Sequence, residues 1–271
     1  MRKGFRILLV VLLLAGLGGV AWLALRGPAE PVYQGKRLSF WLQGYSPSLQ
    51  NTRERWNQAD AAMNDAGTKA IPTLLRMLRA SEPAWKIKLY GLLQQQHLFK
   101  IDHTPANIQN TEAGRAFARL GPDARDAVPA LISIYKQNIS VVSQAQTAWV
   151  LGYIGPAASN AVPVLLAHAC TAAPGNSTNL VILSSAIVAL GQIHSQPATV
   201  VPALIELLRR HNADCENWIS IALGEYGSDA KLGLPMMIKC YEAQSNTNMK
   251  AHIAAAIKKI DPEAAAKVGV K

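Results

Sequence analysis

A short motif that begins with glycine and ends with proline recurs along the chain, and it constrains the fold more than any other feature. The glycine position is filled by Gly67, Gly121, Gly155, His194, Gly227 and, in a truncated last copy, Asp261. The prolines are Pro72, Pro129, Pro163, Pro202 and Pro235, each followed by apolar residues. Successive copies begin 33 to 39 residues apart, except for a step of 54 residues after Gly67. A spacing of this size is typical of repeats made of one small structural unit.

The motif predicts a turn between two helices. Glycine adopts positive φ readily and closes the C-terminus of a first helix, whereas proline lacks an N–H group and suits the first turn of a second. Apolar residues recur at intervals of three and four, and no stretch alternates with period two. One such hairpin cannot bury both of its apolar faces, so neighbouring copies must stack. The sequence therefore predicts an all-α fold.

A second signature lies upstream of several copies, as in Ala148-Trp-Val-Leu-Gly152 and Ile187-Val-Ala-Leu-Gly191. Together the two signatures resemble HEAT repeats, in particular the short bacterial type with the consensus A-L-G-x-I-G-P…A-V-P-x-L, over roughly residues 59–268. The resemblance implies a right-handed α-solenoid of about five helical hairpins within residues 59–271. Residues 38–58 resemble the N-terminal cap of exported HEAT proteins. The long step predicts an added helix or loop within residues 81–114.

The amino terminus predicts a membrane segment. Ile7–Leu25 contains no charged residue, and as a helix it would be about 28 Å long, close to the thickness of a bilayer core. Basic residues in positions 1–6 favour a cytoplasmic amino end, and residues 26–37 form a linker. We therefore expect a single-pass protein of the cytoplasmic (inner) membrane with its C-terminal domain on the outer, periplasmic side. A cleaved signal peptide, which would give a secreted form, is the alternative.

The charge pattern bears on the partner. The net charge is +10, but acidic and basic residues are mixed, which argues against nucleic acid as a partner. The 69 residues Gln137–Ile205 contain no Asp, Glu, Lys or Arg. This segment is either an ordinary uncharged exterior or a surface for a protein partner or for self-association, because interface cores are depleted in charge.

The repeat register predicts which surface a partner would meet. Residues two, three and six positions after each proline are expected in the core, and those at four and seven on an exposed face. HEAT-like solenoids place their second helices on the concave side, so the resemblance implies that this face meets a partner. The resulting stripe comprises Arg76, Arg79, Ser133, Lys136, Ala167, Cys170, Glu206, Arg209, Lys239 and Glu242.

The sequence offers little that points to catalysis. It contains no H-E-x-x-H motif, Walker loop, dinucleotide fingerprint or G-x-S-x-G elbow, and no cofactor or metal is predicted. We expect a non-catalytic protein-binding scaffold or adaptor. One alternative is a HEAT-like enzyme or enzyme accessory, similar to the HEAT-like lyases, that binds a small ligand in the groove. Another is a binder of an anionic polymer through Arg76, Arg79, Lys86 and Lys88.

Cysteine and tryptophan residues complete the expectations. Cys215 and Cys240 fall at neighbouring ends of antiparallel helices, so they are either a disulfide or buried thiols. Trp149 and Trp218 lie at helical spacing and are expected in the core. The tryptophans near the amino end, Trp41, Trp56 and Trp85, are expected to cap the first repeat or to anchor a partner.

Overall fold

The computed structural model describes residues 29–46, 52–83, 88, 104–171, 177–210, 215–267 and 269. The expected membrane span Ile7–Leu25 and most of the expected insertion within 81–114 lie outside the described residues. Within these ranges the protein is all-α. Apart from helices, the described residues form two strands of two residues each, β1 (Val32–Tyr33) and β2 (Lys36–Arg37), which pair antiparallel. The predicted all-α class is therefore confirmed.

The helices follow one another in pairs behind a short N-terminal element made of α2 (Leu38–Leu42) and the 3₁₀ helix η1 (Gln43–Tyr45). The first helices of the pairs are α3 (Thr52–Ala66), α6 (Ala106–Leu120), α8 (Val141–Ile154), α10 (Ser177–Ile193), α12 (Glu216–Glu225) and α14 (Thr247–Ile260). The second helices are α4 (Ile71–Leu78), α7 (Val128–Gln137), α9 (Val162–Thr171), α11 (Pro197–Arg210), α13 (Leu234–Ala243) and α15 (Pro262–Lys267). Helix α3 crosses the expected boundary between cap and repeats at residue 58.

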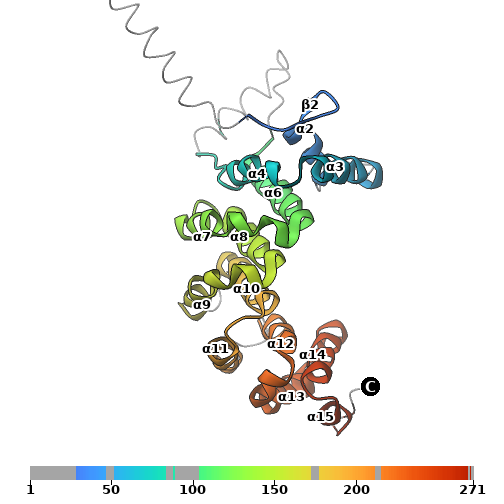
Figure 1. Cartoon of the computed structure of the whole chain (residues 1–271). Coiled ribbons are helices and arrows are strands. Elements are labelled where there is room, and N and C mark those ends of the chain that lie inside the picture. Colours follow the sequence, from blue (N-terminus) through green and yellow to red (C-terminus); the bar gives the residue numbers. More distant parts are fainter. Residues whose placement is uncertain are drawn as a thin grey trace, which may run out of the picture.

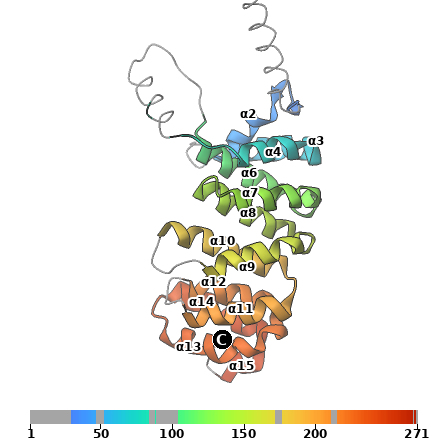
Figure 2. The same ribbon diagram turned by 90° about the vertical axis from the view of Figure 1, so that its left-hand side faces the viewer.

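The pairs stack in sequence order and form two layers. In one layer α6, α8, α10, α12 and α14 each contact the next, and in the other layer α9, α11 and α13 do the same. Each second helix also packs against the first helix of the following pair, as α7 does on α8 and α9 on α10. Figure 1 shows α7, α9 and α11 along one side of this stack, and Figure 2 turns that side toward the reader. Contacts are thus made between neighbours in the sequence.

The turn between helices follows the predicted chemistry. The four motif glycines Gly67, Gly121, Gly155 and Gly227 have φ between 51° and 72°, and His194, which occupies the same position, has a φ of 47°. Four of these turns continue as the 3₁₀ helices η2 (Gly67–Ala70), η3 (Gly121–Ala127), η4 (Gly155–Ala161) and η5 (Gly227–Gly233). The motif proline then falls in the first turn of α4, α7 and α13.

Two copies depart from the prediction. Helix α11 begins at Pro197, so the motif proline Pro202 lies inside it rather than at its start. Gln196 has a φ of 54°, so the chain turns there and the helix starts one residue later. The last copy lacks positive φ: Asp261 has a φ of −154°, and its carboxylate accepts hydrogen bonds from the backbone N–H groups of Glu263 and Ala264. Asp261 therefore caps the start of α15, as an Asp at this position commonly does.

One described stretch, Val141–Thr171, is long and apolar enough by composition to cross a membrane. In the structure it is three elements, α8, η4 and α9, with Gly155 at φ 72° and ψ −143° between the first two. Its buried side chains include Leu151, Ile154 and Leu165, and α8 packs on both α6 and α10. We therefore assign this stretch to the interior of the helical stack.

Candidate functional site

The layer of second helices carries the ten residues of the predicted partner-binding stripe. They are Arg76 in α4 and Arg79 at its C-terminal end, Ser133 and Lys136 in α7, Ala167 and Cys170 in α9, Glu206 and Arg209 in α11, and Lys239 and Glu242 in α13. Nine of the ten are exposed, and Glu206 is half-buried. Contacts join α4 to α7, α7 to η4, α9 to α11 and α11 to α13, so the stripe follows one layer from pair to pair.

The core positions on the same helices also agree with the repeat register. The residue two positions after each motif proline is buried in all five copies, as Leu131 and Leu165 illustrate. The residue three positions after it is half-buried in every copy. Sequence reasoning missed the fifth position, where Met77, Ile134, Leu207 and Cys240 are buried. Helical geometry places that position beside the second, so the apolar face is wider than predicted.

Charged residues of the stripe on α4 and α11 form ion pairs within the protein. At the amino end Arg76 pairs with Glu30 at 3.4 Å. At α11 the carboxylate of Glu206 pairs with Arg210 and Arg209, each at 2.7 Å, and their hydrogen bonds, that of Arg210 first, hold its pKa below its ordinary value. The middle of the stripe, which falls within the charge-free segment, contains Ala167 and Cys170 and carries no charge.

The opposite layer presents aromatic side chains that the sequence reasoning placed in the core. Trp149 in α8 is 38% exposed and Trp218 in α12 is 40% exposed, so that prediction was wrong. Tyr153, one turn after Trp149, is also 38% exposed, and the two rings meet edge to face with centroids 5.4 Å apart. Helix α8 buries polar side chains such as Ser143 and Thr147 as well as apolar ones such as Leu151, so the pattern of apolar residues could not reveal its outer face.

The tryptophans near the amino end pack within the cap. Trp41 donates a hydrogen bond from Nε1 to the backbone oxygen of Tyr33 at 2.9 Å. Trp56 meets Tyr45 edge to face and lies 5.0 Å beneath the guanidinium of Arg115. These contacts fit the expected capping use. Trp85 lies outside the described residues.

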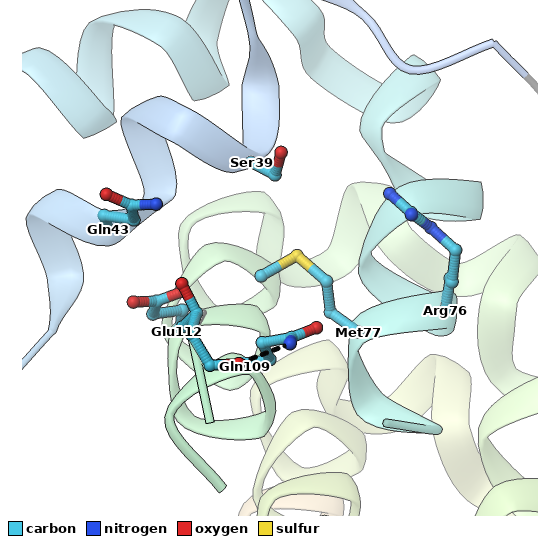
Figure 3. A pocket seen from close by; sticks show the side chains of 7 residues that line it. Ser39, Gln43, Arg76, Met77, Gln109 and Glu112 are labelled. Atoms are coloured by element: carbon cyan, nitrogen blue, oxygen red, sulfur yellow. Dashed lines mark hydrogen bonds between the residues drawn. The ribbon is translucent and has the colours of Figure 1, made fainter. Parts of the chain in front are cut away.

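A cavity of about 260 Å³ lies between α2, α4 and α6 at the amino end of the stack. Its lining combines hydroxyl, carboxamide and charged groups around one thioether: Ser39, Gln43, Arg76, Met77, Thr104, Gln109 and Glu112. Figure 3 shows Gln43 and Glu112 on one side of the cavity and Arg76 on the other. The amide nitrogen of Gln109 donates to the backbone oxygen of Thr104 at 2.7 Å. Arg76 is the one residue shared with the stripe.

Glu112 is the most unusual group in this cavity. It is 1% exposed, and none of the described residues hydrogen-bonds to its buried Oε1 atom. Burial raises its pKa to about 8, and the nearby Arg115 guanidinium only partly offsets that shift. A buried carboxyl whose pKa is this strongly perturbed, in a cleft, is a candidate functional group. Sequence reasoning missed Glu112 because charged residues are normally expected on the exposed face of a helix, and the sequence of α6 gives no sign that this one is buried.

The cysteines differ in burial. Cys170 is exposed, whereas Cys215 at the start of α12 and Cys240 in α13 are both buried, so the choice between a disulfide and buried thiols stays a prediction. Burial, together with the carboxylate of Glu216, raises the pKa of the Cys240 thiol to about 11. No group of three or more His, Cys, Asp and Glu side chains that could hold a metal gathers in the part of the chain that the structure describes.

Comparisons with known proteins assign no family. No protein-family model matches the chain, and no curated protein matches it significantly.

Proposed function

We propose that this protein is an exported, membrane-anchored α-solenoid of HEAT-like hairpins that binds a protein partner without catalysis. The regular glycine turns, the proline-started second helices and the contacts between successive pairs support the solenoid reading. Extended stacks of this kind offer long binding surfaces. The HEAT-repeat resemblance adds that such proteins chiefly bind, and it points to a bacterial source.

The observation that carries the binding proposal is the exposed pair Trp149 and Tyr153 within the charge-free segment. Aromatic side chains dominate binding energy where they lie in water-excluded, uncharged surroundings. Each of these two rings leaves 38% of its surface exposed in the isolated chain. On the other layer the same segment contributes Ala167 and Cys170, which are small and uncharged. The two layers thus give two candidate faces, an aromatic first-helix face and the second-helix stripe.

The test is capture of a partner with matched variants of the full chain. The wild-type protein, solubilised from native envelopes in detergent, is expected to retain one stoichiometric protein at moderate salt. Trp149→Glu tests the first-helix face, and Ala167→Glu combined with Cys170→Lys tests the stripe. Leu232→Glu is the control, because Leu232 is an apolar residue of η5 that is 81% exposed. Recovery of a second copy of the chain would identify the partner as itself.

The outcome decides between the classes of function. Loss of the partner in one of the two face variants, with an unchanged melting curve and full retention in Leu232→Glu, supports protein binding and locates it. Retention in both face variants contradicts it. Loss of all partners from the wild type at moderate salt favours the anionic-polymer alternative, since such binding weakens steeply with salt. The small-ligand alternative is favoured by the cavity beside Glu112.

Membrane attachment is a separate part of the proposal. It rests on the apolar, charge-free residues Ile7–Leu25 and on the basic residues before them. The protein is expected to stay in the membrane pellet at alkaline pH and to be digested by protease added to spheroplasts. Release into the soluble fraction with a shortened amino end would instead support the cleaved, secreted form.

A further inference from the structure

The cavity between α2, α4 and α6 is lined by a buried carboxyl that has no hydrogen-bond partner at its Oε1 atom among the described residues. Glutamate is almost never fully buried in proteins unless it is paired. Glu112 is 1% exposed, yet no ion pair or hydrogen bond joins its carboxyl to another described side chain, and its Oε1 atom has no partner. Leaving a buried acceptor unsatisfied costs about 1–3 kcal/mol, and more for a charged group.

The protein's own cations near Glu112 are engaged elsewhere. Arg115, one turn further along α6, donates a hydrogen bond to the backbone oxygen of Tyr45 and stacks over the ring of Trp56. Arg76, across the cavity in Figure 3, pairs with Glu30. Each of these two cations therefore has contacts of its own, and no ion pair joins either of them to Glu112, which lines the cavity.

The other described elements that pack on α6 place no further charge on Glu112. Neither α2 nor α8 contains a charged residue. Helix η1 contributes Tyr45, whose hydroxyl donates to Asp60 of α3 at 2.5 Å, and Asp60 is itself acidic. The cations of α3 and η3, Arg53, Arg55 and Arg125, are exposed, and Arg119 acts on the Tyr45 hydroxyl. Among the described residues Arg115 is the one charge that shifts the pKa of Glu112, which leaves a place for the positive group of a ligand.

The other lining groups can complete the coordination of such a ligand. An ammonium group has three donors and no acceptor, so it needs oxygen atoms around it. The side-chain nitrogen of Gln109 donates to the backbone oxygen of Thr104, so the side-chain oxygen of Gln109 remains as an acceptor. The Ser39 hydroxyl and the Gln43 carboxamide line the same cavity, and Met77 supplies an apolar wall for a short alkyl chain. A volume of about 260 Å³ suits a small group rather than a large cofactor.

We propose that this cavity is a binding site for a small molecule that carries a primary ammonium group, with Glu112 as its counter-ion. The site is separate from the proposed protein-binding faces, apart from Arg76 at its rim. Because the carboxyl must lose its proton to form the pair, binding at neutral pH releases up to one proton. With the pKa of the empty site at about 8, affinity should rise about tenfold between pH 6 and 7, and about tenfold again between pH 7 and 9.

The test uses the methyl group of Met77 as a reporter. The full chain in detergent is labelled with ¹³C in its methionine methyl groups, and Met77→Leu assigns the signal. The probe is n-butylammonium at millimolar concentrations, and n-butanol is the neutral probe of similar shape. A saturable shift of the Met77 signal with n-butylammonium, absent with n-butanol and strengthened from pH 6 to pH 9, supports the proposal.

Glu112→Gln is the decisive variant, since it keeps the shape of the side chain and removes its charge. The variant is expected to fold, because an amide replaces a carboxyl that is mostly neutral at pH 7, and its other methionine signals report on that directly. Its Met77 signal should not respond to n-butylammonium. A shift retained in Glu112→Gln, an equal response to n-butanol, affinity that falls above pH 8, or no saturable shift in the wild type would each overturn the ammonium site.

Discussion

A Cβ atom placed on Gly191 of α10 would lie 2.8 Å from the Cα atom of Ala222 in α12, closer than side-chain carbons approach a backbone. The same relation recurs one pair later, where a Cβ on Gly224 would lie 2.8 Å from the Cβ of Ala256. The first helices of successive pairs therefore touch backbone to backbone at these points. The A-L-G signature near the ends of α10 and α12 thus sets the spacing between these helices and the next first helix.

Replacing Gly191 by alanine should force α10 and α12 apart. Because the opposing atoms belong to the backbone and Cβ of Ala222, no flexible side chain can move away, and overpacking of this kind costs about 1–3 kcal/mol. The measurement is the free energy of unfolding in urea. Ser185→Ala on the same helix is the control, because the Ser185 hydroxyl donates to the backbone oxygen of Val181. Its free energy of unfolding should differ from that of the wild type by no more than about 0.5 kcal/mol. Equal stability of Gly191→Ala and the wild type would contradict the close packing.

Gly155→Ala tests backbone conformation alone. No atom lies within 4 Å of a Cβ at this position, so the new methyl group meets open space. The backbone there has φ 72° and ψ −143°, a combination essentially restricted to glycine, and side chains forced into it cost about 1–3 kcal/mol. Urea unfolding should show a loss of that size. A neutral or stabilising result would mean that the turn after α8 takes another conformation.

The turns could be predicted from the sequence because each depends on local chemistry. The freedom of glycine at positive φ and the fixed φ of proline act within one or two residues, and His194 was assigned to a glycine position that does have positive φ. The start of α11 was predicted wrongly, because the turn at Gln196 has no glycine to mark it. The exposure of Trp149 was also missed, since α8 buries polar as well as apolar residues, and the packing of neighbouring helices decides which face stays outside.

Asn110 of α6 hydrogen-bonds with its side chain to three backbone carbonyl groups at the C-terminal end of α4. Its side chain is fully buried, and its Nδ2 atom donates to the backbone oxygens of Met77, Leu78 and Ala80 at 2.8, 3.1 and 3.2 Å. Asn110→Ala removes these bonds. The oxygens of Met77 and Leu78 keep the Ala80 N–H and the Ser143 hydroxyl as donors, whereas the Ala80 oxygen loses the donor shown for it, so the free energy of unfolding should fall by about 1–3 kcal/mol. Asn107→Ala, an exposed change on the same helix, is the control. Equal effects of the two variants would contradict this capping role.

The three cysteines should differ in reactivity. The thiolate is the nucleophile, so an exposed thiol reacts with maleimide at neutral pH and a buried one does not. We expect fast modification of Cys170 alone in the native protein, because Cys240 is buried and its pKa is raised to about 11. Mass spectrometry after unfolding without a reductant should then show three modified thiols. Only one modified thiol under those conditions would mean that Cys215 and Cys240 form a disulfide, and Cys170→Ser identifies the fast site.

The cavity group Glu112 shows where sequence reasoning about function stops. The residues next to Glu112 in the sequence do not distinguish a glutamate on the surface of α6 from one that lines a cavity. Its environment comes from α2 and α4, which lie about 70 and 35 residues earlier in the chain. The partner-binding stripe, in contrast, could be listed from the register, since it follows one helix face at a time.

The unusual carboxyl also predicts how stability varies with pH. The pKa of Glu112 is raised from 4.5 to about 8 on folding, so the folded protein binds the proton more tightly than the unfolded chain does. Its contribution is therefore fully present below about pH 4.5 and is lost as pH rises to about 8, at up to about 1.4 kcal/mol per pH unit. Glu112→Gln removes this dependence. The difference in the free energy of unfolding between variant and wild type, measured in urea at intervals from pH 5 to pH 8, should grow in favour of the variant as pH rises. A constant difference would show that the carboxyl titrates normally, and one that shrinks would show that an undetected donor stabilises its ionised form.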